Sequence, residues 1–150
     1  MTDQLPDPPA EFDVERAAPG DELDVRRVLD AAMLAVDESL PERIAAGDAF
    51  VARFRPAGTV VGALVATRPE PGRRHVDAVA VRRARRGRGI GSALVAAAID
   101  DAATEPTIEL ISAAFAPALR SFYMDLGFDV APRPSSDDRL WGSRRVPERA

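Results

Sequence analysis

Hydrophobic and polar positions change their period several times along the chain, and each change predicts a new element. Residues 12–15 alternate between apolar and acidic side chains, which is typical of a short strand. Apolar residues then recur at helical spacing from Asp21, the expected N-cap, to Val36. Pro41 is expected to end this helix, and residues 42–46 to add one further turn.

Three apolar segments follow, separated by short connections rich in proline and glycine. Their period of two, or their continuous apolar character, indicates strands, and the short connections are typical of hairpins. The sequence therefore predicts a three-strand antiparallel meander over residues 49–54, 59–67 and 75–81.

The second half of the chain alternates helical and strand patterns. A helix is expected over residues 91–103, a buried strand over 107–115, and a second helix from Pro117 to the stop at Gly127. Two more strands, residues 128–130 and 139–144, complete the pattern.

Composition sets the domain organisation. The 150 residues are enough for one domain with a substantial core. Residues 1–11 hold three prolines and no periodic pattern, so we expect a flexible arm, then a domain over 12–144 and a tail over 145–150. No apolar run is long enough to span a membrane, and the polar start does not resemble a signal peptide, which favours a cytoplasmic protein without a membrane partner.

The residue types that are missing restrict the chemistry. The chain has no cysteine, its 20 basic residues are all arginine, and His75 is the single histidine. This composition excludes cysteine nucleophiles, thiolate metal sites, lysine Schiff bases and lysine-dependent phosphate loops, and we expect no metal site. Carboxylates, hydroxyls, Tyr123 and the peptide backbone remain, which favours positioning and proton transfer, as in acyl transfer.

The most informative segment is a glycine-rich loop, residues 82–92, between a predicted strand and a predicted helix. Glycine at 87, 89 and 91 lets several backbone N–H groups converge on one point, and the helix start adds positive potential. These features predict an anion site, with Arg86 and Arg88 adding ionic contacts. A dinucleotide fingerprint fits poorly, because Ser92 stands where that motif needs its third glycine.

Two motifs together resemble the GNAT superfamily of N-acetyltransferases. The segment 86–91, Arg-Gly-Arg-Gly-Ile-Gly, is similar to that family's coenzyme A loop, and 122–128, Phe-Tyr-Met-Asp-Leu-Gly-Phe, is similar to its second signature. The motifs stand about 35 residues apart, in the family's order. The resemblance extends over residues 12–144 and implies an α/β fold, with a mixed, mainly antiparallel sheet of about six or seven strands flanked by helices.

The resemblance also implies a reaction and a site. The chain would transfer an acetyl group from acetyl-CoA to an amine, either a small molecule or a protein amino group, by direct attack in a ternary complex. Tyr123 matches the tyrosine that protonates the departing thiolate, and an N–H near Ala80 or Val81 would stabilise the oxyanion. The residues expected to bind the cofactor through the strand and the loop are Val79, Ala80, Val81, Arg86, Gly87, Arg88, Gly89, Ile90, Gly91 and Ser92.

Some features of the family are not matched here. Ala116 stands seven residues before the tyrosine, where family members often have asparagine. No residue carries over as general base, and local position suggests only His75, Asp77 or Glu109. The acceptor pocket of such folds uses residues 30–47 and 131–142, where the candidate partners for a cationic amine are Asp37, Glu38, Glu42, Asp137 and Asp138.

Other interpretations remain open at this stage. The chain could be a non-catalytic acyl-CoA-binding or regulatory module, a reading that Ala116 favours. The five arginines between 82 and 88 could instead bind nucleic acid, although the net charge of −4 and few aromatic residues argue against such a partner. Tyr123 and Trp141 could be packing residues. The family resemblance also makes a homodimer the expected assembly.

Overall fold

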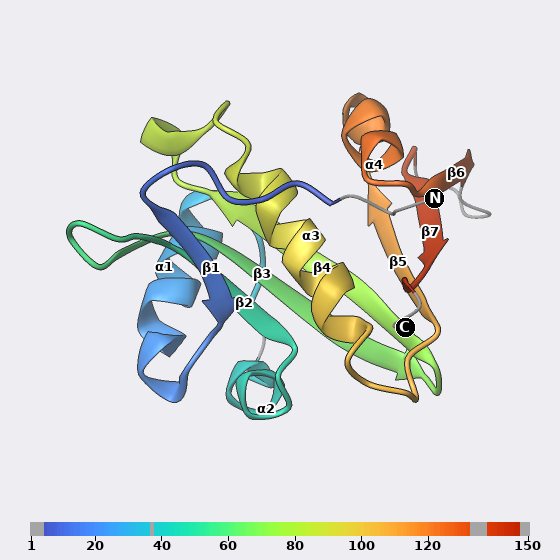
Figure 1. Cartoon of the computed structure of the whole chain (residues 1–150), viewed down its shortest axis with the longest axis horizontal. Coiled ribbons are helices and arrows are strands. Elements are labelled where there is room, and N and C mark those ends of the chain that lie inside the picture. The colour runs from blue at the N-terminus through green and yellow to red at the C-terminus, as the bar shows by residue number, and fades with distance from the viewer. Residues whose placement is uncertain (1–4, 37, 133–137, 148–150) are drawn as a thin grey trace.

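The structure, a computed structural model, describes residues 5–36, 38–132 and 138–147. One sheet of seven strands, in the order β1-β2-β3-β4-β5-β7-β6, forms the centre of the molecule (Figure 1). The strands are β1 (Phe12–Arg16), β2 (Ala49–Phe54), β3 (Thr59–Glu70), β4 (Arg73–Val81), β5 (Leu110–Phe115), β6 (Asp129–Pro132) and β7 (Leu140–Arg145). The helices are α1 (Glu22–Ala31), α2 (Leu40–Ala45), α3 (Ile90–Ala102) and α4 (Arg120–Asp125).

The sheet confirms the predicted fold class. β1 to β4 are joined in antiparallel order, β4 and β5 form the one parallel pair, and β7 pairs antiparallel with both β5 and β6. The parallel pair requires a crossover, which α3 provides over one face of the sheet. The α/β architecture, mixed and mainly antiparallel, is therefore as the sequence predicts.

Two hydrophobic clusters cover the two faces of the sheet. The larger holds the apolar face of α3, for example Leu94 and Ile99, together with Tyr123 of α4. The smaller holds Val25 of α1 and Ile44 of α2. Figure 1 shows α3 crossing one face, with α1 and α2 on the other. The helices are short, and none in the described part of the chain is long and apolar enough to cross a membrane.

The helix expected to reach Val36 ends five residues earlier, at Ala31. Met33 adopts a left-handed φ of 60°, and the N–H of Leu34 donates to the carbonyl of Leu29 at 2.9 Å. This pattern closes a helix, and it is normally marked by glycine, so the continuing apolar spacing concealed it. Pro41 does not end a helix either: it lies in the first turn of α2, where its missing N–H costs nothing.

Several strand bounds also differ from the prediction. β3 and β4 extend until only Pro71 and Gly72 separate them, and Gly72 takes a left-handed φ of 85° at this tight turn. β5 begins at Leu110, not at Thr107. The helix expected from Pro117 begins as a 3₁₀ turn and becomes α-helical only at Arg120.

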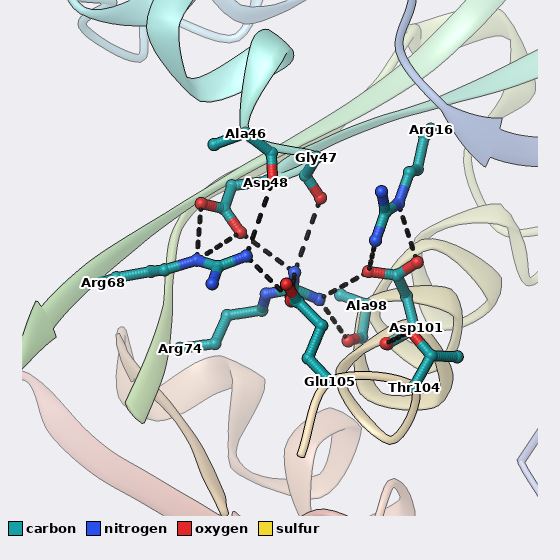
Figure 2. Close-up of polar contacts among 10 residues, drawn as sticks. All are labelled: Arg16, Ala46, Gly47, Asp48, Arg68, Arg74, Ala98, Asp101, Thr104 and Glu105. Atoms are coloured by element: carbon teal, nitrogen blue, oxygen red, sulfur yellow. Dashed lines mark hydrogen bonds and ion pairs between the residues drawn. The ribbon is translucent and has the colours of Figure 1, made fainter. Parts of the chain in front are cut away.

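A buried arginine joins the sheet to the end of α3. Arg74 of β4 is fully buried, and its guanidinium donates to Asp48 at 2.9 Å, Asp101 at 3.1 Å and Glu105 at 3.3 Å (Figure 2). It also donates to the carbonyl of Ala98 at 2.9 Å. Arg68 and Arg16 complete the cluster: Arg68 pairs with Asp48 at 2.9 Å and Glu105 at 2.8 Å, and Arg16 pairs with Asp101 at 2.8 Å. The sequence pattern did not indicate this network.

Candidate functional site

The site begins where β4 separates from β5. Their parallel pairing ends at Val76, although β4 continues to Val81. A β-bulge follows at once: Val76 belongs to the cluster under α3, whereas Ala78, two residues later, belongs to the cluster on the opposite face. Since side chains two apart in a regular strand share a face, Asp77 is the extra residue that turns the strand over.

This separation leaves main-chain groups of β4 without a partner strand. In an antiparallel pair, successive residues turn their N–H and C=O alternately toward and away from the partner. Arg82 donates its N–H to Val61 of β3 at 2.7 Å, so Ala80 also faces β3. Val79 and Val81 therefore face the side from which β5 has diverged, and Val81 is the better placed of the two predicted oxyanion donors.

The glycine loop has the conformation that its sequence suggested. Gly87 and Gly89 have φ angles of 78° and 85°, a region that other residues enter only with strain. Gly89 is the N-cap of α3, and the first bond within the helix runs from the N–H of Ala93 to the carbonyl of Gly89. The amides of residues 90–92 thus precede the first helical bond, and with the helix dipole they can bind an anion.

These main-chain groups surround one cavity of about 530 Å³. It holds nine of the ten predicted cofactor-binding residues, all except Arg88, and its walls also include residues just after α1, at the start of α4 and in the loop. The lining residues are Ala32, Leu34, Val79, Ala80, Val81, Arg85, Arg86, Gly87, Gly89, Ile90, Gly91, Ser92, Leu119 and Phe122. Another cavity, of about 710 Å³, lies beside the β3–β4 turn and contains none of the predicted cofactor-binding residues, although Glu109, a candidate base, lines it.

Three of the loop arginines contact the protein itself. Arg82 donates to the carbonyl of Val60 at 3.1 Å, and Arg86 donates to the carbonyl of Val81 at 3.0 Å. The guanidinium of Arg85 lies 4.4 Å from the ring centroid of Phe54. These three side chains therefore help to hold the loop in place.

Tyr123 lies in the core beneath α4. Its ring stacks on Phe115 with centroids 4.1 Å apart and meets Phe128 edge-on at 5.2 Å, and the residue is only 3% exposed. Burial raises the pKa of Tyr123 to about 12, partly opposed by the charge of Arg139. Phe122, its neighbour, lines the cavity in its place. Tyr123 is thus a packing residue whose hydroxyl stays protonated near neutral pH.

Five lining residues are not among the predicted cofactor-binding residues: Ala32, Leu34, Arg85, Leu119 and Phe122. Ala32 and Leu34 lie in the range 30–47 expected to contribute to the acceptor pocket. Ala32 and Leu34 reach the cavity because α1 ends early and the chain turns back at Met33. Leu119 and Phe122 reach it from the 3₁₀ turn before α4 and from α4 itself.

The three candidate bases lie apart from the cavity. Glu109 precedes β5 at the level of Arg73, so it is about 26 Å along β4 from Val81. His75 contacts Ser112 at 2.9 Å and stacks on Trp141 with centroids 5.4 Å apart, so Trp141 packs on the last strand as expected. Asp77, at the bulge, is nearest by strand position and is paired with Arg43 at 3.1 Å.

The candidate acceptor residues are only partly described. Asp37 and Asp137 lie outside the described residues, as does part of the predicted tail. Glu38, Glu42 and Asp138 are exposed. Their role as partners of a cationic amine remains a prediction.

Residues 18–128 match the family described as Acetyltransferase (GNAT) family. The chain belongs to this family. Since the match covers both the glycine loop and α4, the cavity at the loop is the candidate coenzyme A site of a GNAT acetyltransferase. No curated protein matches the chain at a significant level.

Solved GNAT structures share the fold at low sequence identity. Ard1 from Thermoplasma volcanium superposes with a TM-score of 0.74 at 20% identity, over 93% of this chain and 100% of that one. Arabidopsis thaliana Naa50, in complex with the bisubstrate analogue CoA-Ac-MVNAL, gives 0.70 at 18%, over 90% and 99%. N-acetylglutamate synthase from Neisseria gonorrhoeae, complexed with coenzyme A and N-acetyl-glutamate, gives 0.72 at 18%, over 93% of this chain but 36% of that one.

Proposed function

We propose that this GNAT acetyltransferase moves an acetyl group from acetyl-CoA to an amine, a small molecule or a protein amino group, by direct attack in a ternary complex. The main support for the proposal is that two sets of main-chain N–H donors line the same cavity. The outward amides of β4 form one wall, and the free amides at the start of α3 form the other.

The residues present fit the coenzyme. The pantetheine arm carries amides that pair with a free strand edge, which the main-chain groups of Val79 and the N–H of Val81 offer; the Val81 carbonyl already accepts from Arg86. Its pyrophosphate suits the amides of residues 90–92, and a Cβ built at Gly87 or Gly89 would meet open space, so no side chain obstructs the approach. Acetyl-CoA supplies the thioester whose acyl carbon the amine attacks.

Three groups of the chain would assist the transfer. The N–H of Val81 would stabilise negative charge that develops on the acyl oxygen. The Tyr123 hydroxyl, which is protonated near neutral pH and stays so into the alkaline range because burial raises its pKa, would donate a hydrogen bond to the departing sulfur. The acceptor amine would approach past Ala32 and Leu34, which form the wall nearest to α1.

Thermal unfolding with added ligands tests the donor. We expect coenzyme A or acetyl-CoA, at about 100 times its Kd, to stabilise the folded protein by about 2.7 kcal/mol, an increase of several degrees in Tm. NAD and ATP, at the same concentrations, serve as controls for any general affinity for nucleotides. No increase with the coenzyme A species, or a larger one with NAD, would overturn the proposal.

The substitution Gly91→Ala is expected to change coenzyme A affinity without lowering the stability of the fold. A Cβ there would lie 3.7 Å from Phe122 and 3.9 Å from Val81, both beside the cavity, and the backbone of Gly91 needs no left-handed φ. We expect Gly91→Ala to weaken coenzyme A binding about tenfold, because the methyl group occupies space next to the strand edge. Alanine favours a helix by up to about 1 kcal/mol over glycine, so Tm should not fall.

Isothermal titration and thermal unfolding of this variant give the two readouts. Gly20→Ala is the matched control, because a Cβ there meets nothing within 4 Å and Gly20 lies outside the cavity. If Gly91→Ala binds coenzyme A as tightly as the original protein, the coenzyme does not use this wall.

A further inference from the structure

The described part of the N-terminal segment contacts the domain from Leu5 onward, while the flexibility expected of residues 1–11 stays a prediction. Leu5 contacts the larger hydrophobic cluster, and the carbonyl of Pro9 accepts a hydrogen bond from the N–H of Phe12 at 3.1 Å. Figure 1 shows this segment leaving β1 and crossing α3 toward α4. It therefore has a defined position next to the start of α3.

The segment forms one wall of a further cavity, also of about 530 Å³. Below, the cavity at the glycine loop is called the first cavity and this one the second. The opposite wall is formed by Arg88, the predicted cofactor residue missing from the first cavity, and by Asp125 of α4. The residues contributed by the N-terminal segment are Leu5, Pro6, Asp7 and Pro9.

The two cavities meet at the predicted pyrophosphate site. Gly89 and Ser92 line both of them. Coenzyme A has its pyrophosphate between two dissimilar halves, the pantetheine arm and a 3′-phosphorylated adenosine. If the pantetheine arm follows β4 in the first cavity, the part beyond the pyrophosphate enters the second.

We propose that residues 5–9 and Arg88 bind the 3′-phosphoadenosine half of coenzyme A; this rests on the proposed function. Arg88 is the one cation on these walls, so the 3′-phosphate lies at that end. The carboxylates of Asp7 and Asp125 would repel a phosphate, but they can accept hydrogen bonds from the amino group of adenine. The prolines and Leu126 offer apolar surface to the base.

Removing residues 1–8 tests the role of the segment while keeping the Pro9 carbonyl that Phe12 uses. Affinities for coenzyme A and for 4′-phosphopantetheine, which lacks the nucleotide, are measured by titration calorimetry. We expect the deletion to weaken coenzyme A binding about tenfold and to leave 4′-phosphopantetheine binding unchanged. An equal loss for both ligands, or no loss for either, would overturn the inference.

Arg88→Ala tests the subsite without shortening the chain. The original protein should bind coenzyme A about tenfold more tightly than 3′-dephospho-coenzyme A, and this preference should disappear in Arg88→Ala. Arg83→Ala is the matched control, because Arg83 is an exposed loop arginine that lines neither cavity, and it should keep the preference.

The outcomes separate this inference from the proposed function. If the original protein binds coenzyme A but shows no preference over the dephosphorylated form, the 3′-phosphate subsite is wrong and the acetyltransferase proposal stands. If it binds neither ligand, both proposals fall.

Discussion

Tyr123→Phe is expected to lower kcat for acetyl transfer about 100-fold while leaving the affinity for coenzyme A within twofold. A positioned proton or hydrogen-bond donor typically contributes a factor of about 10² or more to the rate. Phenylalanine keeps the ring that stacks on Phe115 at 4.1 Å, so the change removes the hydroxyl and little of the packing. Steady-state kinetics with acetyl-CoA and an amine acceptor, beside a coenzyme A titration, measure the two quantities.

Phe128→Leu is the control for packing around Tyr123, because Phe128 contacts the tyrosine ring edge-on at 5.2 Å and carries no donor. It should lower Tm without a comparable fall in kcat. An unchanged kcat in Tyr123→Phe would show that the tyrosine is a core residue only. A protein that binds acetyl-CoA without any turnover would instead support the non-catalytic module.

The pH dependence gives an independent readout of the same residue. Burial raises the pKa of Tyr123 to about 12, so the protonated donor form persists throughout the neutral and mildly alkaline range. As pH rises from 7 to 10, ionisation of Tyr123 should therefore not lower the rate, whereas an unperturbed phenol, with a pKa of about 10, would be half ionised at pH 10. A descending limb between pH 9 and 10 that disappears in Tyr123→Phe would contradict this assignment.

The loop could be predicted from the sequence because its features are local. Alternate glycines between a strand and a helix permit the left-handed φ found at Gly87 and Gly89, and the start of α3 leaves amides free. No tertiary contact is needed to deduce this. The same reasoning explains why nine predicted residues of two adjacent segments surround one cavity.

The other walls of the cavity depend on contacts that no local pattern records. The bulge at Asp77 has no signal in the sequence, because residues 78–81 are all apolar and do not show which face each side chain takes. Only the pairing with β3 and β5 shows that the strand turns over there. Leu34 reaches the cavity because α1 closes at Met33, a residue without a glycine's preference for positive φ. The N-terminal segment had no periodicity, so its packing through Leu5 could not be anticipated.

The burial of Arg74 could not be predicted from the local sequence either. Two arginines just before a strand suggest an exposed turn, and the strand was expected to begin at His75. In the fold Arg74 is buried, because Asp48, Asp101 and Glu105, all more than 25 residues away in sequence, converge on it. Only the completed sheet and the end of α3 bring these acids together.

Arg74→Ala is expected to lower the free energy of unfolding by about 3–5 kcal/mol, a large part of the stability of a domain this size. The change leaves the buried carboxylate of Asp48 with a single arginine partner, Arg68, and removes the donor to the Ala98 carbonyl. It also leaves space in the core where the side chain lay. Urea denaturation measures the loss.

Arg55→Ala is the matched control: Arg55 and Asp13 are 60% and 49% exposed, so breaking that pair should leave stability unchanged within error.

Coenzyme A affinity separates the stabilising role of Arg74 from any role at the site. Arg74 lies seven residues before Val81 on the same strand, about 23 Å along it. Below its lowered Tm, Arg74→Ala should therefore bind coenzyme A as the original protein does, because folded molecules keep the strand edge and the glycine loop. If Arg74→Ala loses no more stability than Arg55→Ala, water must donate hydrogen bonds to the acids in place of Arg74. Weakened binding in fully folded protein would mean that the cluster also determines how β4 diverges from β5.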